Sequence, residues 1–444
     1  MNVVYLMSVL VVSIALIVFL IMKVKLNAFV ALTIAGLALG IAAGMPLADV
    51  AASFQKGMGG TLGFLATVLG LGTILGKMLE VSGGAQRLAQ TLIKSFGERN
   101  AHWAMMVVAF ICGIPVFFQV GFVLLIPVIF SIAKQTGMSL VKIGVPVVSA
   151  LITVHAMVPP HPAALAVVNQ LGADIGLVIV LSLLVGLPAA IIAGPIYGSY
   201  IAKRAVANPP ESLTIGEIIP EEKLPKFGIT LFTILLPMLI MVAKTIVDLV
   251  APEDAPYLGL VAFLGNPITA LLISALFAYW SLGLARGMNM DTIGKVTEEC
   301  FKPVASILLI IGAGGAFNQV LQDSGIGTVL GEVLTGLNMS PVIMAWLIAI
   351  IMRFAVGSTT VAMITSAGIV LPLLATMPDV NPAVLCLAIG AGGIGLSHVN
   401  DSGFWIVKEY YGMSLTDTFK TWTASTTIAS VVALGGTLLV DLVV

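Results

Sequence analysis

Charged side chains are scarce in this sequence. Only 9% of its 444 residues are charged and 59% are hydrophobic, whereas soluble domains carry about 25% charged residues. The formal net charge is −1 and no run of basic residues occurs, which excludes the electrostatic footprint of a nucleic-acid-binding protein. Together with a mean hydropathy of +1.12, this composition predicts an all-α polytopic membrane protein embedded in a lipid bilayer.

Cysteines are few as well. The three present, Cys112, Cys300 and Cys386, each lie in or beside an apolar segment. They show neither a disulfide framework nor the spacing of a metal site, so we predict no metal centre. No Gly-Lys-Ser or Gly-Lys-Thr sequence follows a glycine-rich loop, which argues against an ATP-driven pump. We expect no cofactor apart from a proton as coupling ion.

Long apolar runs dominate what is present. A bilayer is crossed by about 20 apolar residues. On this criterion we expect spans near residues 3–22, 26–44, 61–80, 101–132, 143–168, 175–202, 229–250, 258–283, 303–322, 341–376, 383–407 and 421–443. Residues 3–22 have no preceding positive charge and are long enough to span, so we interpret them as a retained first helix and not as a signal peptide.

Two spans are too long for one crossing. Residues 101–132 are interrupted by Gly113-Ile114-Pro115, and residues 341–376 by Gly357-Ser358-Thr359-Thr360. Proline and glycine at these points break a helix. We therefore predict two re-entrant helical hairpins, each of which enters and leaves the membrane by the same face.

Two further spans contain polar breaks. Residues 143–168 include Val158-Pro159-Pro160-His161-Pro162, and residues 383–407 include the stretch Gly395–Trp405, with its His, Asn, Asp and Ser side chains. A charge at the centre of a membrane helix costs about 2.5–3.5 kcal/mol on insertion scales. We therefore predict discontinuous helices that unwind around a cavity lined by protein.

The chain divides near its midpoint into two similar halves. A polar linker at 203–226 separates residues 1–202 from 227–444, and landmarks recur at an offset near 240. Asn27 corresponds to Asn266, His155 to His398 and Gly172 to Gly412. Basic residues fall on opposite sides of corresponding spans, so the positive-inside rule predicts inverted repeats, a cytoplasmic linker and two non-cytoplasmic termini. Inverted repeats with broken helices are typical of secondary transporters.

The hairpin tips and the breaks supply the candidate substrate-binding groups. Half-helix ends offer free N–H groups and a positive dipole that suit an anion, and hydroxyl and amide groups suit a polyhydroxylated ligand. Back-bonding of Ser and Thr to their own helix is the alternative. The predicted substrate-binding set is Gln119, His161, Arg353, Ser358, Thr359, Thr360, Asn400 and Ser402.

Three ionisable residues at the breaks are candidates for proton coupling. His155 and His398 titrate in the physiological range unless they are satisfied core histidines, and Asp401 is the acid within the second break. Asp401 can serve as a proton relay, a cation ligand or a hydrogen-bond anchor for substrate. Arg353 either snorkels to the outer interface or neutralises a substrate carboxylate. Lys77 and Glu80, three residues apart, are expected to pair with each other.

At these residues the sequence resembles the gluconate permease family of proton symporters, within the ion transporter superfamily. The resemblance covers essentially the whole chain. It is carried by five motifs: Gly59–Gly63, Val116–Leu124, Val158–Pro162, Gly357–Ala362 and Ser397–Trp405. It implies proton-coupled uptake of gluconate or a related sugar acid across a bacterial inner membrane. The superfamily implies a homodimer whose transport domains move in an elevator manner.

The resemblance leaves the substrate and the coupling open. The family includes D-serine permeases, which Ile74–Gly83 and Pro159–Ala164 resemble, whereas Ser397–Asp401 and Arg353 resemble the sugar-acid branch. Many family members carry an acid where this chain has Gln119, so coupling would fall to the histidines or Asp401.

We therefore expect a secondary active transporter for a small hydroxylated carboxylate, with a D-serine or other small amino-acid symporter as the alternative. A passive channel would show no accumulation. A membrane-embedded enzyme would need a nucleophile or metal set facing water, and none of suitable spacing is evident in the sequence.

Overall fold

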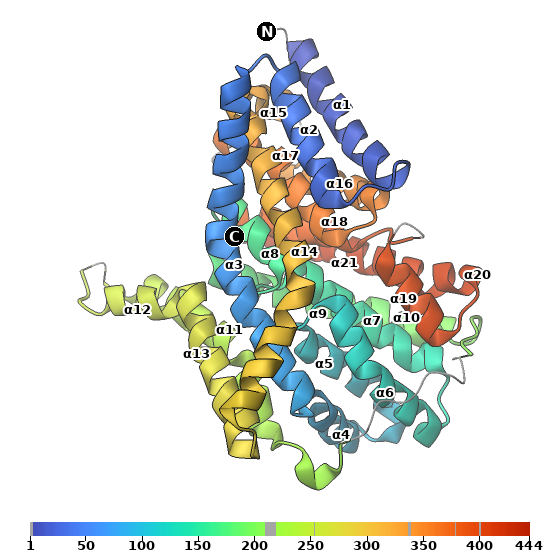
Figure 1. Ribbon diagram of the computed structural model, residues 1–444. Coiled ribbons are helices and arrows are strands. Elements are labelled where there is room, and N and C mark those ends of the chain that lie inside the picture. Colours follow the sequence, from blue (N-terminus) through green and yellow to red (C-terminus); the bar gives the residue numbers. More distant parts are fainter. Residues whose placement is uncertain (1–2, 209–218, 253, 336–338, 378, 399–400) are drawn as a thin grey trace.

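The computed structural model is all-helical throughout the residues that it describes, namely 3–208, 219–252, 254–335, 339–377, 379–398 and 401–444. By length and composition, seven of its helical stretches are long and apolar enough to cross a membrane. Shorter apolar helices of 10–17 residues accompany them. The chain is thus a multi-span helical membrane protein that combines long and short helices (Figure 1).

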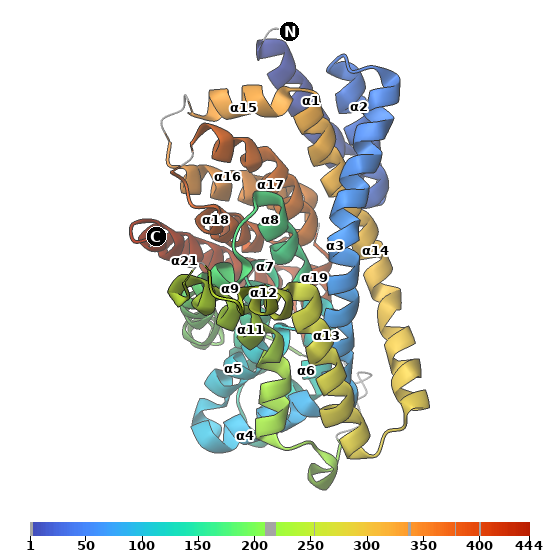
Figure 2. The same ribbon diagram turned by 90° about the vertical axis from the view of Figure 1, so that its left-hand side faces the viewer.

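Two long helices form one side of the molecule. Helices α3 (Leu47–Val81) and α14 (Met290–Asp323) pack against each other along their length, and Figure 2 shows them running together beside the remaining helices. A Cβ on Gly57 would lie 2.5 Å from Cβ of Gln319, and one on Gly315 2.0 Å from Oγ1 of Thr61. Glycine is required at these crossings because the two helices approach too closely for any side chain.

Both long helices begin earlier than the sequence predicts. The apolar criterion placed spans at 61–80 and 303–322, but α3 has 35 residues and α14 has 34. At about 1.5 Å per residue each is roughly 50 Å long, more than the hydrocarbon core of about 30 Å. Their polar first turns, with Asp49 and Asp291, are helical although hydropathy does not reveal them.

Two helix pairs are joined by short connections. Helix α5 (Ala101–Gly113) contacts α6 (Phe118–Thr136), and α16 (Pro341–Val356) contacts α17 (Thr359–Thr376). Gly357 has φ +78° and ends α16 in the left-handed conformation, which a residue without Cβ adopts at little cost. The breaks that we predicted from Gly113–Pro115 and Gly357–Thr360 therefore coincide with the ends of these helices.

Two helices in the buried core are discontinuous. Helix α7 (Leu140–Met157) is followed by α8 (Pro162–Leu171), and α18 (Pro382–Ile394) by α19 (Ser402–Tyr411). Nearly all of α7, α8 and α18 is buried. Pro159 and Pro160 cannot donate backbone hydrogen bonds, which stops α7 at the position that the sequence indicates.

The remaining elements surround this core. They are α1 (Val3–Met22), α2 (Ala28–Ala42), α4 (Gly84–Phe96), α9 (Ile175–Ile191), α10 (Tyr197–Ile201), α11 (Phe227–Val250), α12 (Leu258–Gly265), α13 (Pro267–Ala278), α15 (Ile326–Thr335), α20 (Leu415–Thr418) and α21 (Ala424–Asp441), with a π-helical turn at Phe419–Thr423 before α21. Asn27 and Asn266 both cap the helix that follows them, and Gly172 and Gly412 both end a helix in the left-handed conformation. The succession of helices α2 to α8 in the first half of the chain is thus repeated by helices α13 to α19 in the second half.

Part of the linker packs against α4. Arg87 donates from Nε to the carbonyl of Pro225 over 2.8 Å, and Lys94 lies 3.1 Å from Glu221. Lys94 and Arg87 lower the pKa of the exposed Glu221 carboxyl below its ordinary 4.5, chiefly through the hydrogen bond and charge of Lys94. These contacts fix the linker at the end of the molecule where α3 ends and α4 begins (Figure 1).

Candidate functional site

A buried ion pair joins α16 to the second helix break. Nη2 of Arg353 lies 2.5 Å from Oδ2 of Asp401, and their side chains are 1% and 10% exposed. Arg353 also donates to the carbonyl of Gly357, the residue that ends α16. Two buried charges are tolerated only when paired and hydrogen-bonded, so the ion pair ties the start of α19 to the α16–α17 connection.

The position of Arg353 corrects one of the two roles that the sequence suggested. At 1% exposure it does not snorkel to an interface. The guanidinium binds Asp401 instead, and its Nε has no hydrogen-bond partner among the described residues. Tertiary contacts between α16 and α19 decide this, and neither helix shows the contact in its own sequence.

Asp401 accepts further hydrogen bonds. It caps α19 by accepting from the amide of Gly403 over 2.9 Å, and the hydroxyl of Ser397 donates to it. Ser397 in turn accepts from Nε1 of Trp422 over 2.6 Å, and its carbonyl accepts from Thr423 over 2.5 Å. This network extends from the ion pair to the π-helical turn before α21.

Sequence reasoning missed Ser397, Trp422 and Thr423 as parts of the site. Ser397 stands directly before the predicted His398, so its place in the motif was a usable signal. Trp422 and Thr423 lie in an apolar span 21 and 22 residues after Asp401, and no local pattern connects them with the break. Trp422 also contacts Phe118 at the start of α6, with ring centroids 5.1 Å apart.

The α5–α6 connection touches both breaks. The ring of Phe117 meets His161 edge-on at 5.6 Å between centroids. Two residues further on, Nε2 of Gln119 lies 3.5 Å from Oγ of Ser402. The connection therefore contacts the start of α8 and the start of α19, so two breaks that are far apart in the sequence belong to one site.

Two histidines of the first break face each other. Nδ1 of His155 lies 3.0 Å from Nε2 of His161, and both side chains are buried. Nδ1 of His161 has no hydrogen-bond partner of normal geometry among the described residues, although the backbone of Val116 interacts with the ring. Arg353 and Asp401 act electrostatically on His155. The pair is thus coupled to the ion pair described above.

His398 lies apart from these groups. Its Nε2 is 2.9 Å from the carbonyl of Phe354, and its ring packs on that of Phe354 at 4.6 Å between centroids. Among the described residues it is linked to the acid through the backbone, where the amide of Asp401 donates to the carbonyl of His398 over 2.8 Å. The structure therefore brings His155 close to His161 rather than to His398.

The hydroxyl groups at the start of α17 differ in their hydrogen bonding. Ser358 caps α17 by accepting from the amide of Val361 at 3.4 Å, which is the local bonding that we weighed as the alternative to ligand binding. Thr359 is buried and Thr360 half-buried, and no hydrogen bond of either hydroxyl occurs within the described part of the chain. Asn400, the remaining predicted binding residue, lies outside the described residues.

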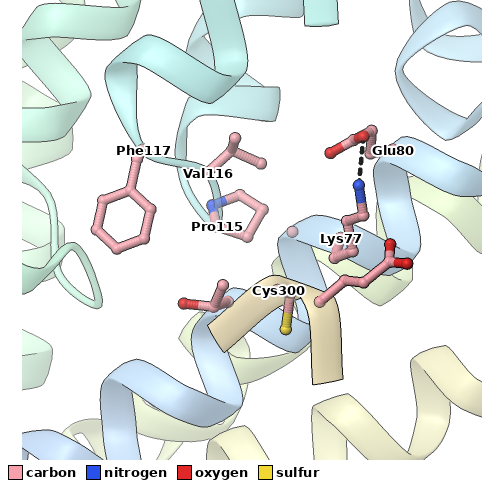
Figure 3. A pocket seen from close by; sticks show the side chains of 9 residues that line it. Lys77, Glu80, Pro115, Val116, Phe117 and Cys300 are labelled. Carbon is pink, nitrogen blue, oxygen red and sulfur yellow. Dashed lines mark hydrogen bonds and ion pairs between the residues drawn. The ribbon is translucent and has the colours of Figure 1, made fainter. Parts of the chain in front are cut away.

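A cavity opens beside the first hairpin connection. It encloses about 140 Å³ between α3, the 114–117 connection and α14. Figure 3 shows Pro115, Val116 and Phe117 on one wall and Lys77, Glu80 and Cys300 on others. Lys77 and Glu80 form the expected ion pair, at 2.6 Å. The wall also includes Thr73, Gly76 and Glu299.

Close packing brings the connection onto α3 at this point. A Cβ on Gly76 would lie 2.7 Å from the carbonyl oxygen of Pro115, so this contact requires glycine. A second cavity of about 20 Å³ shares Thr73, Pro115 and Phe117 with the first and reaches His161. Among the described residues, no group of three or more His, Cys, Asp or Glu side chains is placed to bind a metal ion.

Comparison with known sequences identifies the protein family to which this chain is similar. Residues 5–443 match the model described as GntP family permease. The chain is 48% identical to the D-serine transporter DsdX of Escherichia coli K12, over 99% of both chains. It is 47% identical to a gluconate permease of Pseudomonas aeruginosa, over 96% of this chain and 95% of the other.

Solved structures with the same fold are more distant. The YdaH transporter of Alcanivorax borkumensis has a TM-score of 0.64 at 16% identity, and covers 93% of this chain and 97% of its own. MtrF of Neisseria gonorrhoeae has a TM-score of 0.60 at 13% identity, with 90% and 85% covered. At these identities the likeness concerns the fold alone.

Proposed function

The chain belongs to the GntP family of permeases and is a multi-pass membrane transporter of a bacterial family, not an enzyme; from this premise we propose that it imports gluconate or a related sugar acid by proton symport. The observation that carries the proposal is the Arg353–Asp401 ion pair, with hydroxyl and amide groups next to it on α17, α19 and α6. Such groups suit a ligand with several hydroxyls and one carboxylate.

In this proposal the carboxylate of the substrate is held at the start of α17. The first four amides of a helix have no intrahelical acceptor, and the helix dipole favours an anion there. Ser358 accepts from Val361, which leaves the amides of Thr359 and Thr360 for the ligand. The two threonine hydroxyls, Gln119 and Ser402 bind substrate hydroxyls, and Asn400 joins them by its sequence position.

Arg353 acts in this proposal as a positioning residue. It holds Asp401 and the carbonyl of Gly357, and so fixes the start of α19 relative to the start of α17. Its positive charge adds to the potential of the site through this fixed geometry. Asp401 correspondingly keeps an electrostatic part in coupling as the partner of Arg353.

The coupled proton is carried by His155 and His161. Their ring nitrogens are 3.0 Å apart, within the distance for direct proton transfer. Gln119 cannot carry a proton, which leaves the histidines as the carriers nearest to the α5–α6 connection. His398, bonded to the carbonyl of Phe354, is the second candidate.

The proposed arrangement in the membrane follows the repeated order of elements. Residues 1–202 and 227–444 form inverted repeats, the linker 203–226 is cytoplasmic, and both termini are non-cytoplasmic. The protein acts in the bacterial inner membrane as a homodimer whose transport domains move in an elevator manner. Cysteine labelling of the linker in sealed right-side-out and inside-out vesicles tests the orientation, and cross-linking in native membranes tests the dimer.

Uptake into proteoliposomes tests the transport activity. With the lumen alkaline, labelled gluconate is expected to accumulate and to carry protons inward. Thr359→Val should reduce uptake, whereas Thr33→Val, on α2 and bonded to the carbonyl of Phe29, should not. Equal internal and external gluconate under a pH gradient would indicate a passive channel and refute the proposal.

D-serine symport is the second candidate, because relatives named for D-serine and for gluconate are almost equally similar to this chain. The same vesicles separate the two. Excess unlabelled aldonates should suppress gluconate uptake and excess D-serine should not. If D-serine competes and aldonates do not, the substrate is an amino acid.

A further inference from the structure

The two cavities beside the α5–α6 connection adjoin each other, because they share three lining residues. The larger begins at Lys77, Glu80 and Glu299, and the smaller ends at His161. Thr73, Pro115 and Phe117 line both. Since about 10–15 Å³ of such space is needed to hold one water molecule and each water in the liquid takes about 30 Å³, the larger cavity has room for several waters and the smaller for one.

The outer end of these cavities carries two carboxylates. Glu80, on α3, is 32% exposed and pairs with Lys77. Glu299, on α14, is exposed, and its side chain makes no ion pair or hydrogen bond within the described part of the chain. Glu80 lies three residues before Gly83, whose would-be Cβ is 2.6 Å from the side chain of Leu224 in the linker, so this mouth of the cavity is at the linker end.

The inner end carries a buried imidazole nitrogen that lacks a hydrogen bond of normal geometry. His161 is 2% exposed and lines the smaller cavity, and its Nδ1 has no normal hydrogen bond. A buried polar atom without a protein partner is usually satisfied by water. Midway, the hydroxyl of Thr73 donates to the carbonyl of Leu69 over 2.7 Å, which leaves its oxygen free to accept from a water.

We propose that these cavities form a water-filled proton route, which runs from Glu80 and Glu299 at the linker end, past Thr73, to Nδ1 of His161. The inference rests on the proposed function, because it assigns a path to the proton of that symport. Neither carboxylate belongs to the substrate site, which lies at the helix breaks.

Each step conserves protons. In the inward direction a carboxylate takes a proton from solvent and passes it to the cavity water. In the reverse direction it takes a proton from the cavity water and releases it to solvent. Nδ1 of His161 receives a proton while Nε2 releases its own to Nδ1 of His155 at 3.0 Å. His155 then holds the transferred proton as an imidazolium. The charged groups around this pair are Arg353 and Asp401 on its inner side, with Lys77, Glu80 and Glu299 at the mouth.

At their opposite end, the two long helices are tightly packed against each other. There the hydroxyl of Ser53 donates to Asp323 over 2.7 Å, and Gln319 donates to the same carboxylate over 2.9 Å. Gly57 is packed directly against Gln319, at 2.5 Å from its would-be Cβ. The acid on this side is thus held by neighbours in a tight helix crossing, whereas Glu299 faces a cavity. Among the described residues, the cavities thus adjoin the linker end of these helices and not the end that carries Asp323.

Proton flux and substrate exchange, measured separately, test the route. The variants are Glu80→Gln with Glu299→Gln, and Glu298→Gln as a matched control, since Glu298 is exposed on α14 but does not line the cavity. A pH-sensitive dye in the vesicle lumen follows protons during gluconate uptake. Counterflow of labelled against unlabelled gluconate at equal pH follows substrate movement alone.

The double variant should slow proton entry by about tenfold, the effect of ~1.4 kcal/mol on a barrier, while counterflow stays within about twofold of wild type. Thr73→Val should also slow proton entry and Thr73→Ser should restore it, which keeps the test informative if the double variant does not fold. Wild-type proton entry in both the double variant and Thr73→Val would overturn the route. An equal loss of counterflow and proton entry would also overturn it, since it would indicate a structural role.

Measurements on the wild-type protein separate the proposed symport from the proposed proton route. If wild-type protein moves gluconate without protons, the proposed symport fails. If it moves both and the variants do so equally well, the symport stands and only the route fails.

Discussion

Removal of the positive charge of Arg353 should destabilise the protein far more than removal of a surface charge. In Arg353→Met, the carboxylate of Asp401 stays buried and, within the described part of the chain, keeps the hydroxyl of Ser397 and the amide of Gly403 as donors. Breaking a buried ion pair in this way costs about 3–5 kcal/mol. The lost hydrogen bond to the carbonyl of Gly357 adds about 1 kcal/mol.

An exposed ion pair provides the matched control. Lys408 lies 2.7 Å from Glu409, whose side chain is 67% exposed, and such pairs contribute about 0–1 kcal/mol. Unfolding by sodium dodecyl sulfate in mixed micelles, followed by tryptophan fluorescence, measures both variants. Lys408→Met should fall close to wild type, whereas Arg353→Met should lose most of its folded fraction.

The double variant Arg353→Met with Asp401→Asn completes the test. It leaves no uncompensated charge, so its loss of stability should be smaller than the sum of the two single losses. Gluconate uptake should nevertheless remain low, since the start of α19 is no longer fixed relative to α17. If the losses add, or if Arg353→Met is as stable as Lys408→Met, the ion pair does not hold the site together.

Three further substitutions test other contacts. Ser397→Ala removes a donor to the buried carboxylate and should lower stability by about 1–3 kcal/mol in the same unfolding assay. Gly57→Ala should prevent the two long helices from closing and reduce uptake, whereas Gly59→Ala, with nothing within 4 Å of its would-be Cβ, should leave uptake unchanged; equal activity would contradict the packing argument. For Glu221 the folded pKa is lowered below 4.5, chiefly by Lys94. The stability that ionised Glu221 contributes is therefore fully present above about pH 4.5 and is lost as the pH falls through the lowered pKa. Proteolysis of the linker should increase below that pKa, and it should increase less in Glu221→Gln.

Much of the helical organisation could be predicted locally. Pro159 and Pro160 end α7, and Gly357 with Ser358 ends α16 and begins α17, because proline lacks an N–H and glycine accepts a left-handed φ. The pairing of Lys77 with Glu80 also follows from their spacing on one helix. The lengths of α3 and α14 were underestimated, because a hydropathy criterion sees only the part of a helix that lies in lipid.

The sequence could name candidate residues of the site but not their partners. It indicated His155, His161 and Asp401 as candidates, and the repeat made His155 correspond to His398. In the folded chain His155 pairs with His161 and His398 turns to the carbonyl of Phe354. Which nitrogen meets which acceptor depends on helices from both halves of the chain.

By itself, the sequence determined that the chain is a helical membrane protein with breaks at Pro159–Pro160 and Gly395–Asp401. Apolar length and helix-breaking residues act within one segment, so their consequences can be derived from the segment alone. Only the tertiary structure decided that Arg353 is buried against Asp401 and that Thr73 and His161 line adjoining cavities. Those facts depend on where helices far apart in the chain come together, and a cavity exists only where their packed surfaces fail to meet.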